Sequence, residues 1–373
     1  MKLVVKLKLA PTAEQAAALL ETMERFNAAC DWLAGKAFEQ HTANKYLLQR
    51  AYYRQIRDDF GLPAQMAVRV IAKTCEVYKR DKSVQPHFKA HGAIVYDQRL
   101  CSFKGLDRVS LLTLAGRQVM PYLFGEYQRP LVERLKGQAD LVYLDGTFYL
   151  YATADVPTPE PAAPEGVLGV DVGVKNIAAD SDGTLYSGAV CNGLRRRHYR
   201  LRQKLQKKGT PSAKRLLKQR RRKESRFQAD VNHVISKQIV GTAALTNRAI
   251  ALEDLKAIRE RITARKDQRR VLHGWAFAQL RSFVEYKSVR AGVVVTAVDP
   301  AYTSQTCPAC GLIDKANRPS QSVFKCVACG LAGPADTIAA KNIAIRGRVA
   351  VMLPHVPVLS RQPLPGPDTS PLL

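Results

Sequence analysis

The stretch LGVDVGVKN, residues 168–176, places one aspartate, Asp171, inside an apolar run that ends at a glycine. The run has the composition of a buried strand. An ionised carboxylate in a protein core costs several kcal/mol unless a positive group meets it. Asp171 is therefore either badly placed or holds a cation, and the rest of the chain has to decide between these two interpretations.

The composition bounds the class of protein. The chain has 373 residues, 46% of them hydrophobic, which is enough for two or three domains with apolar cores and excludes a disordered chain. Its 58 Lys and Arg against 32 Asp and Glu give a formal net charge of +26. Such a charge indicates a polyanionic partner, with nucleic acid as the first candidate.

The sequence predicts neither a membrane span nor a signal peptide. No apolar run reaches 18 residues, and Lys6 and Lys8 interrupt the apolar N-terminal run. We therefore expect a cytoplasmic or nuclear protein with reduced thiols.

The N-terminal residues predict one strand followed by one helix. Residues 2–9 alternate apolar side chains with lysines, which is typical of a half-buried strand with a basic outer face. Thr12 and Gln15 fit a capping box, and apolar residues recur at helical spacing over 19–37.

A further helix is expected to begin at Pro63 and run toward Arg80, because proline favours the first helical position. Residues 92–154 then change to short strands with turn signals, among them the Asp-Gly pair at 145–146, a strong hairpin signal. Residues 1–155 therefore predict a small β-barrel, with a helical insertion at about 11–90.

Two proline-rich stretches carry no periodic apolar pattern. Four prolines fall within 156–166, which predicts a semi-rigid linker between domains. Six prolines fall within 354–373, which we expect to be a disordered tail.

Residues 194–227 form the densest charge run, with sixteen Lys or Arg against one acid, Glu224. The segment 209–213 has turn composition, so the run predicts a basic helical hairpin. A charge run is often only a solvated face, but mixed signs are then expected, so this ratio favours phosphate contact. The candidate nucleic-acid-binding residues are Arg195, Arg196, Arg197, Arg220, Arg221 and Arg222.

Two C-x-x-C pairs predict a metal site. Cys307 and Cys310 precede Cys326 and Cys329 by fifteen intervening residues, and a glycine follows each pair. This spacing allows four thiolates to bind one Zn²⁺ tetrahedrally in a structural site that has no vacant position for catalysis. The alternative is free thiols or a redox pair. The remaining cysteines, Cys30, Cys75, Cys101 and Cys191, are interpreted as small buried hydrophobes.

Two further acids repeat the placement of Asp171. Glu253 follows the apolar run 249–252, and Asp336 follows Pro334 in the first turn of a predicted helix. Three acids at the ends of three core elements suit two magnesium ions, which take oxygen ligands, and Asp171 would bridge them. The alternatives are that the strand-end acids pair with lysines and that Asp336 only favours a helix N-terminus.

These residues resemble a known family. LGVDVGVKNIAADSDG, ALEDLK, YTSQTCPACG with CVACG, and ADTIAAKNIAIRG are similar to the three RuvC motifs and the zinc ribbon of the TnpB family. That family consists of transposon-encoded RNA-guided DNA endonucleases related to the miniature type V CRISPR effectors. The likeness extends to MKLVVKLKLAPTAEQ, LPAQMAVRVI and FKGLDRVSLLTL, which resemble the family's N-terminal strand, recognition helix and wedge barrel.

The resemblance implies an α+β multidomain fold: a wedge barrel with a helical recognition insertion, then an RNase H-like RuvC domain with an inserted zinc ribbon. It places the RuvC domain in 167–300, the ribbon in 301–333 and the last RuvC helix in 334–350. It also implies that Asp171, Glu253 and Asp336 are catalytic and act with two Mg²⁺ ions.

The partners implied by the resemblance are a guide RNA and target double-stranded DNA. The N-terminal lobe is expected to recognise a short target-adjacent motif, and one site cuts both strands in turn. The basic surface suits a heteroduplex held by its backbone while base pairing carries the sequence. The expected location is the prokaryotic cytoplasm, in association with the nucleoid when DNA is bound, as a monomer or a homodimer.

One position departs from the family pattern. The family usually has an asparagine two residues after the third acid, where this chain has Ile338, although Asn342 of the neighbouring AAKNI is retained. Loss of that amide either weakens support for a metal ligand or is a tolerated variant, since three carboxylates remain.

The leading hypothesis is a guide-dependent DNA endonuclease that hydrolyses phosphodiesters with two metal ions and leaves a 5′-phosphate and a 3′-hydroxyl. One alternative is a regulator that binds DNA under RNA guidance without cutting it, against which the intact trio of acids argues. Another is an RNase H-fold transposase that uses the same acids for strand transfer.

Overall fold

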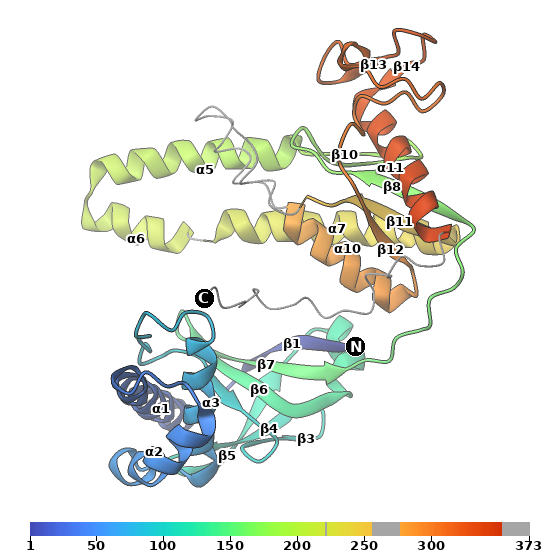
Figure 1. Ribbon diagram of the computed structural model, residues 1–373. Coiled ribbons are helices and arrows are strands. Elements are labelled where there is room, and N and C mark those ends of the chain that lie inside the picture. The colour runs from blue at the N-terminus through green and yellow to red at the C-terminus, as the bar shows by residue number, and fades with distance from the viewer. Residues whose placement is uncertain (221, 256–276, 353–373) are drawn as a thin grey trace. The chain divides into compact units, whose positions relative to one another are not determined.

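The computed structural model describes residues 1–220, 222–255 and 277–352. The chain divides into two compact units, with the boundary between Pro157 and Thr158 (Figure 1). That boundary falls inside the proline-rich stretch 156–166. Within the described ranges, no helix is long and apolar enough to cross a membrane. The expected disordered tail, 354–373, lies outside the described residues.

The N-terminal unit combines an antiparallel sheet with helices inserted after its first strand. The strands pair in the order β2-β6-β7-β1-β5-β4-β3. They are β1 (Lys2–Leu9), β2 (Ile94–Tyr96), β3 (Cys101–Lys104), β4 (Arg108–Thr113), β5 (Gly116–Leu123), β6 (Leu135–Leu144) and β7 (Thr147–Asp155). The helices are α1 (Ala13–Glu39), α2 (Lys45–Phe60), α3 (Ala64–Tyr78) and the short η1 (Glu126–Gln128) and α4 (Arg129–Val132).

The sheet of this unit is nearly closed. The hydroxyl of Tyr96 on edge strand β2 donates to the carbonyl of Leu112 on β4, at 2.9 Å, so the two ends of the sheet approach each other. Asp145 and Gly146 have φ of 50° and 81° and turn the chain from β6 to β7, as their Asp-Gly sequence predicts. The alternation of β1 is also confirmed, with buried apolar residues and exposed lysines.

The helices of this unit match the predicted ones with one addition. Thr12 and Gln15 form the predicted capping box of α1, and Pro63 is the N-cap of α3. The addition is α2, which the sequence analysis does not predict. Its N-cap is Asn44, whose side chain accepts from the backbone N–H of Tyr46 at 2.9 Å. Only two α2 residues are fully buried, so its apolar stripe is too weak to stand out in the sequence.

The C-terminal unit is built on a mixed sheet of order β10-β9-β8-β11-β12. Strands β8, β9 and β10 pair antiparallel, whereas β11 is parallel to both β8 and β12. The strands are β8 (Gly166–Asp171), β9 (Asn176–Asp180), β10 (Leu185–Ser187), β11 (Arg248–Glu253) and β12 (Val295–Val298).

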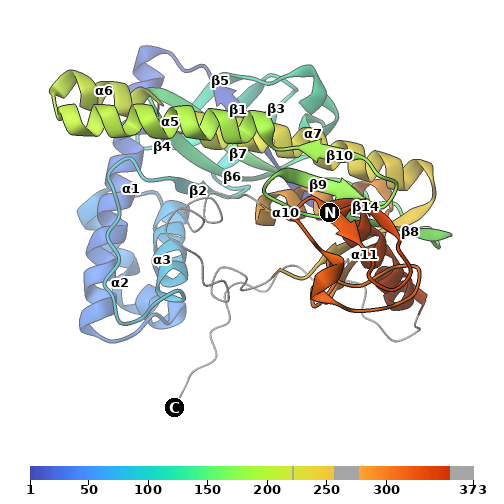
Figure 2. The ribbon, with the colours of Figure 1, turned by 90° about the horizontal axis from the view of Figure 1, so that it is seen from above.

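The helices of this unit cover both faces of the sheet. Helices α7 and α10 share one apolar core with β8, β9 and β11, and α11 packs along β8 on the opposite face (Figure 2). Helices α5 and α6 form a hairpin. The bounds are α5 (Ala189–Lys208), α6 (Pro211–Arg220), α7 (Lys223–Leu245), α10 (Phe277–Ala291) and α11 (Ala335–Met352).

Two glycines allow α11 to approach the sheet closely. A Cβ on Gly169 of β8 would lie 2.0 Å from the carbonyl oxygen of Ala340, and one on Gly347 of α11 would lie 2.4 Å from the Cβ of Ala251. Only backbone fits between helix and sheet at these points. The position of α11 is thereby fixed against β8 and β11.

A small cysteine-containing module is inserted between β12 and α11. It contains η2 (Lys315–Asn317) and the hairpin of β13 (Val323–Lys325) and β14 (Ala332–Pro334). Strand β14 ends one residue before α11 begins, so the module is continuous with the helix (Figure 1).

Candidate functional site

The two strand-end acids lie on the face of the sheet that α11 covers. Side chains of a strand alternate between its faces, and the positions next to the acids on β8 and β11 pack against α7 and α10. In the parallel register Val170 lies opposite Leu252, which puts Asp171 and Glu253 side by side one residue further on. Both acids therefore point toward α11.

Asp336 completes the group from the first turn of α11. The three predicted acids line one cavity of about 360 Å³, together with residues such as Thr303 and Arg318. Asp171, Glu253 and Asp336 are thus brought to one place although they come from three separate elements.

Burial makes ionisation of two of these acids, Asp171 and Glu253, costly. The pKa of Asp171 is raised to about 7, first by burial and then by the charges of Glu253 and Asp336, while Arg318 acts in the opposite direction. Burial also raises the pKa of Glu253, which the hydrogen bond from Thr303 partly offsets. Such a group favours a bound cation, because a cation stabilises all three carboxylates at once.

Neighbouring polar side chains hold two of the acids in place. The amide of Asn176 on β9 donates to Asp336 Oδ2 at 2.8 Å. The hydroxyl of Thr303 donates to Glu253 Oε1 at 2.6 Å, and the guanidinium of Arg318 lies 3.9 Å from Asp336 Oδ1. No local spacing links Asn176, Thr303 or Arg318 to the acids, so the sequence does not predict them as site residues.

Ile338 has an apolar role. It is buried in the core of the cysteine module, next to Phe324, Cys307 and Cys326. Asp336 instead receives an amide hydrogen bond from Asn176 of a different strand. An amide of another element thus contacts Asp336, while Ile338 itself contributes no polar group.

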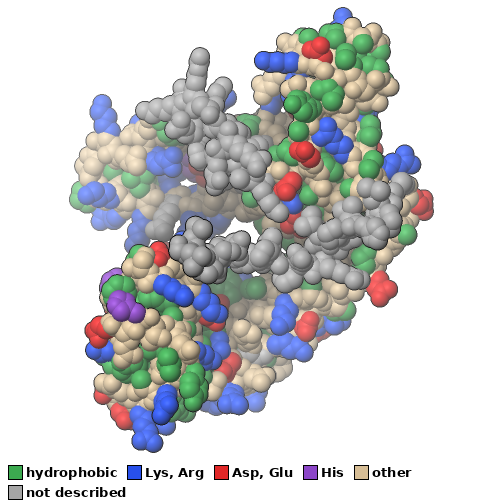
Figure 3. All heavy atoms as spheres, in the orientation of Figure 1, with side chains coloured by type: hydrophobic (Ala, Val, Ile, Leu, Met, Phe, Trp, Pro, Cys, Tyr) green, Lys and Arg blue, Asp and Glu red, His purple; other side chains and the backbone are tan. Residues whose placement is uncertain are grey.

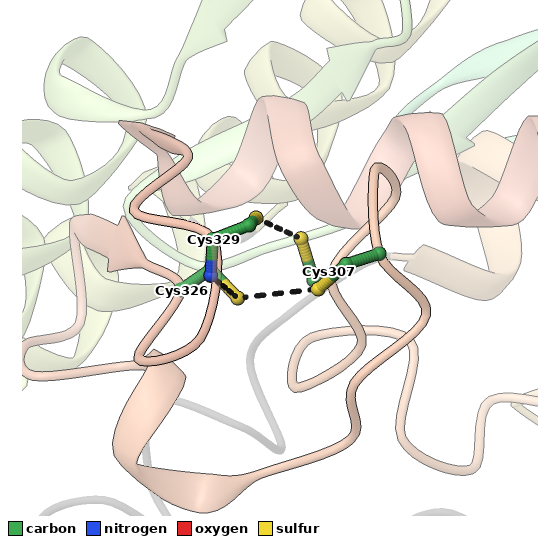
Figure 4. A group of neighbouring side chains, drawn as sticks. Cys307, Cys326 and Cys329 are labelled. Carbon is green, nitrogen blue, oxygen red and sulfur yellow. Dashed lines mark hydrogen bonds between the residues drawn. The ribbon is translucent and has the colours of Figure 1, made fainter.

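The four predicted cysteines form a compact cluster. Their sulfur atoms all lie within 4.8 Å of one another, and the pairs Cys307–Cys329 and Cys310–Cys326 each have an Sγ–Sγ distance of 3.5 Å. Figure 4 shows the side chains of Cys307, Cys326 and Cys329 close together. Thiolates around a tetrahedral Zn²⁺ stand about 3.8 Å apart, as Zn–S bonds of ~2.3 Å require. The cluster is consistent with a zinc site.

The backbone around the cysteines is shaped for this cluster. Gly311 and Gly330 have φ of 76° and 73°, a left-handed conformation that lets the chain turn back after each cysteine pair. The buried Asn317 ties the two loops together: its amide donates to the carbonyls of Gln305 and Leu312, and its oxygen accepts from Val327 N–H at 2.9 Å. Both loops are therefore held near each other by protein contacts alone.

The four cysteines and the three acids differ in spacing. Among the described residues, the four cysteines form the one cluster of three or more such side chains compact enough for a single ion. The three acids line their cavity more widely. The acids are therefore not grouped around one point as the cysteines are.

The basic segment folds as the predicted hairpin. Helices α5 and α6 are joined at Gly209, which has a φ of 65°, and Figure 3 shows Lys and Arg side chains gathered over them. Arg196, Arg197 and Arg222 are exposed and Arg220 is partly so. Arg195 contacts Glu224 at 3.4 Å and Gln228 at 3.1 Å. Arg221 lies outside the described residues.

Comparison with known proteins supports the resemblance. A family model described as the Cas12f1-like TNB domain matches residues 277–343. A TnpB-like protein of Methanocaldococcus jannaschii is 29% identical over 65% of this chain and 92% of its own length. InsQ of Escherichia coli K12, provisionally named an RNA-guided DNA endonuclease, is 27% identical over 92% of each chain.

Cas12f1 proteins are also similar. The CRISPR-associated endodeoxyribonuclease Cas12f1 of Sulfoacidibacillus thermotolerans is 41% identical over 35% of this chain, which spans only 29% of that relative's length. The solved Cas12f1–guide RNA–target DNA complex superimposes with a TM-score of 0.56 at 14% identity, over 87% of this chain and 82% of the other.

The mini RNA-guided endonuclease Cas phi3 gives a TM-score of 0.60 at 11% identity, over 94% and 92% of the two chains. At these identities the superpositions show a shared α+β fold. The TnpB-like, InsQ and Cas12f1 relatives and the matching family model confirm the resemblance to the TnpB family and to the miniature type V effectors.

Proposed function

We propose that this protein is an RNA-guided DNA endonuclease that hydrolyses target DNA next to a short adjacent motif, using the cavity of Asp171, Glu253 and Asp336. The observation that carries the proposal is the convergence of three acids, each 82 or 83 residues from the next, on one cavity. Separate ion pairs would not require this convergence.

Asp171, Glu253 and Asp336 would hold two Mg²⁺ ions. When bound, such a pair stabilises the charge on the attacking and the departing oxygens of a phosphodiester. The expected products are a 5′-phosphate and a 3′-hydroxyl.

The surrounding residues orient the acids and receive the substrate. Asn176 and Thr303 hold the carboxylates of Asp336 and Glu253 in fixed directions. Arg318 and Lys175 also line the cavity, and their positive charges can pair with a phosphate of the substrate.

Several observations support a RuvC-type, RNase H-like domain for this cavity. The sheet is mixed, and Asp171 and Glu253 are the last residues of two neighbouring parallel strands. The names of the relatives support a guide RNA and a target DNA as partners, and the target that we propose is double-stranded. By the same resemblance, the N-terminal unit recognises the adjacent motif, and the protein works in the prokaryotic cytoplasm.

In this proposal the cysteine module has a structural role and the basic hairpin binds nucleic acid. Cys307, Cys310, Cys326 and Cys329 would bind one structural Zn²⁺. Arg196, Arg197, Arg220 and Arg222 on the hairpin, together with Arg195 and Arg221, would contact nucleic-acid phosphates. A cavity of about 700 Å³ with both basic and leucine side chains lies between α5, α6 and α7.

The test is cleavage of target DNA by protein assembled with RNA transcribed from the DNA beside its gene, in the presence of Mg²⁺. We expect Asp171→Ala to slow cleavage by about 10³-fold or more, since the lost charge stabilisation amounts to several kcal/mol. The matched control is Asp182→Ala, which removes an acid of the same unit that pairs with Arg248 instead of lining the cavity. Equal cleavage by Asp171→Ala and wild type would refute the proposal.

A further inference from the structure

Thr303 occupies an unusual position between the acid cavity and the cysteine module. It is 4% exposed, and its hydroxyl has two acceptors within reach. Glu253 Oε1 lies at 2.6 Å and the carbonyl of Pro300 at 3.1 Å. A hydroxyl has one proton, and the shorter distance and the carboxylate charge direct it to Glu253.

The backbone of Thr303 is itself fixed by α11. The amide of Asn342, 4% exposed, donates one hydrogen to the carbonyl of Thr303 at 2.8 Å and the other to that of Thr306 at 2.7 Å. Both amide hydrogens are thereby used on the segment that carries the hydroxyl. Arg346, one turn further along α11, donates to the carbonyls of Asp299 and Ala301 at 2.7 and 2.6 Å.

The other end of the same segment enters the cysteine cluster. Thr306 directly precedes Cys307, and the carbonyl of Gln305 accepts from Asn317, the residue that ties the two cysteine loops. Residues 303–307 are therefore held by α11 on one side and by the cluster on the other. Helix α11 carries Asp336 directly and, through Asn342, also fixes the group that touches Glu253.

We infer that Thr303 is a positioning residue that sets the direction of the Glu253 carboxylate, and that Asn342 and the cysteine module hold Thr303 for this purpose. The inference rests on the proposed function of the acid cavity. Glu253 lies at the end of β11, and the hydroxyl of Thr303 is the hydrogen-bond donor to its carboxylate among the described residues. Groups that hydrogen-bond a metal-ligating carboxylate affect metal affinity and activity by about 10- to 100-fold.

The test compares Thr303→Val, which keeps the shape of the side chain but removes the hydroxyl, with Thr303→Ser, which keeps the hydroxyl. Mn²⁺ binding to the protein without nucleic acid is followed by electron paramagnetic resonance, with Asp171→Ala as the blank. Thr303→Val is expected to weaken Mn²⁺ binding about tenfold and to lower the cleavage rate by a similar factor without changing DNA affinity. Thr303→Ser is expected to keep the Mn²⁺ affinity and the cleavage rate close to those of the wild type.

The matched control is Thr22→Val, since Thr22 is a fully buried threonine of the N-terminal unit whose hydroxyl donates to the carbonyl of Ala18. It loses a buried hydroxyl without touching the cavity, so its Mn²⁺ affinity should match wild type. Unchanged Mn²⁺ affinity in Thr303→Val, or an equal loss in Thr22→Val, would overturn the inference. If wild type binds Mn²⁺ but cuts no DNA, the proposed function fails while the role of Thr303 is still decided by the binding data.

Discussion

The cysteine cluster and the acid cavity, both in the C-terminal unit, are assembled in opposite ways. The thiolates come from two C-x-x-C loops within 23 residues, residues 307–329, whereas the acids span 166 residues, from 171 to 336. The cysteines need only two tight turns to meet. The acids meet only when β8, β11 and α11 take their native places.

The two groups also differ in what they leave open. Four thiolates complete a tetrahedral shell, so a metal bound there can only support the fold. Three carboxylates that line a cavity leave positions for water and substrate, so ions bound there can act on a phosphodiester. Loss of a cysteine should therefore lower the stability of the unit, whereas loss of one of the three acids should lower the cleavage rate.

Removal of one thiolate should have the largest effect on stability. Cys326→Ser should lose the bound metal and cost the C-terminal unit at least about 4 kcal/mol, because metal binding by such clusters is coupled to folding. Zinc content by atomic absorption and the melting temperature by calorimetry measure both effects. Asp171→Ala should keep its zinc and its melting temperature. A Cys326→Ser protein with wild-type stability would remove the distinction.

The close approach of α11 offers the second test. Gly169→Ala should destabilise the unit by about 3 kcal/mol, because its Cβ would collide with the backbone of Ala340 and Ala344. Calorimetry should show a fall of roughly 6 to 12 °C in Tm. Gly241→Ala is the control: it lies in α7 with open space around it, so alanine should stabilise the helix by about 0.5–1 kcal/mol. Equal Tm values for the two variants would contradict the packing described.

The basic hairpin should contribute to nucleic-acid binding and have no effect on metal binding by the cysteine cluster. Replacing Arg196 and Arg197 with glutamine should weaken nucleic-acid binding and reduce the slope of log affinity against log salt by about one for each phosphate that is no longer neutralised. Zinc content should not change. Fluorescence anisotropy over a salt series measures the slope.

The control for the hairpin removes the same number of charges elsewhere. Arg25 and Lys36 on α1 each pair with an acid, Glu21 and Glu39, so their replacement with glutamine should leave the slope close to that of wild type. A slope that falls equally in both double variants would show that only net charge matters.

The smallest effect concerns an acid outside both groups. Arg248 lowers the pKa of Asp182 through a hydrogen bond and its charge. This pair therefore adds stability above the unfolded pKa of an aspartate, about 3.9, and loses it as the pH falls through the lower folded pKa. Asp182→Asn should cost about 0.5 kcal/mol at pH 7. Urea titrations should show that difference shrinking toward pH 3; a constant difference would contradict the assignment.

The sequence predicted those parts of the site that have a local pattern. The cysteine pairs and their glycines, the basic hairpin and the three acids each stand at a recognisable spacing or strand end. The alternation of β8 and β11 even orients Asp171 and Glu253 together. The capping box of α1 and the Asp-Gly turn were predicted for the same reason, since their chemistry lies within a few residues.

The remaining parts depend on tertiary structure. Asn176, Thr303 and Arg318 reach the acids only because separate elements meet, and no pattern in the sequence marks those meetings. Helix α2 escaped prediction because few of its residues are buried. In the sequence, Ile338 stands where the family usually has an asparagine. Its burial against the cysteine module is visible only in the folded chain.

Strand β14 continues directly into α11, so the cysteine module and the helix are joined without a connecting loop. The helix of 18 residues is about 27 Å long, and Asp336 lies at the end nearest the module. A change in the orientation of the module would therefore also move that carboxylate. Ile313 and Val327 of the module are exposed. A macromolecule that binds the module there and reorients it would therefore change the position of Asp336 relative to the other two acids.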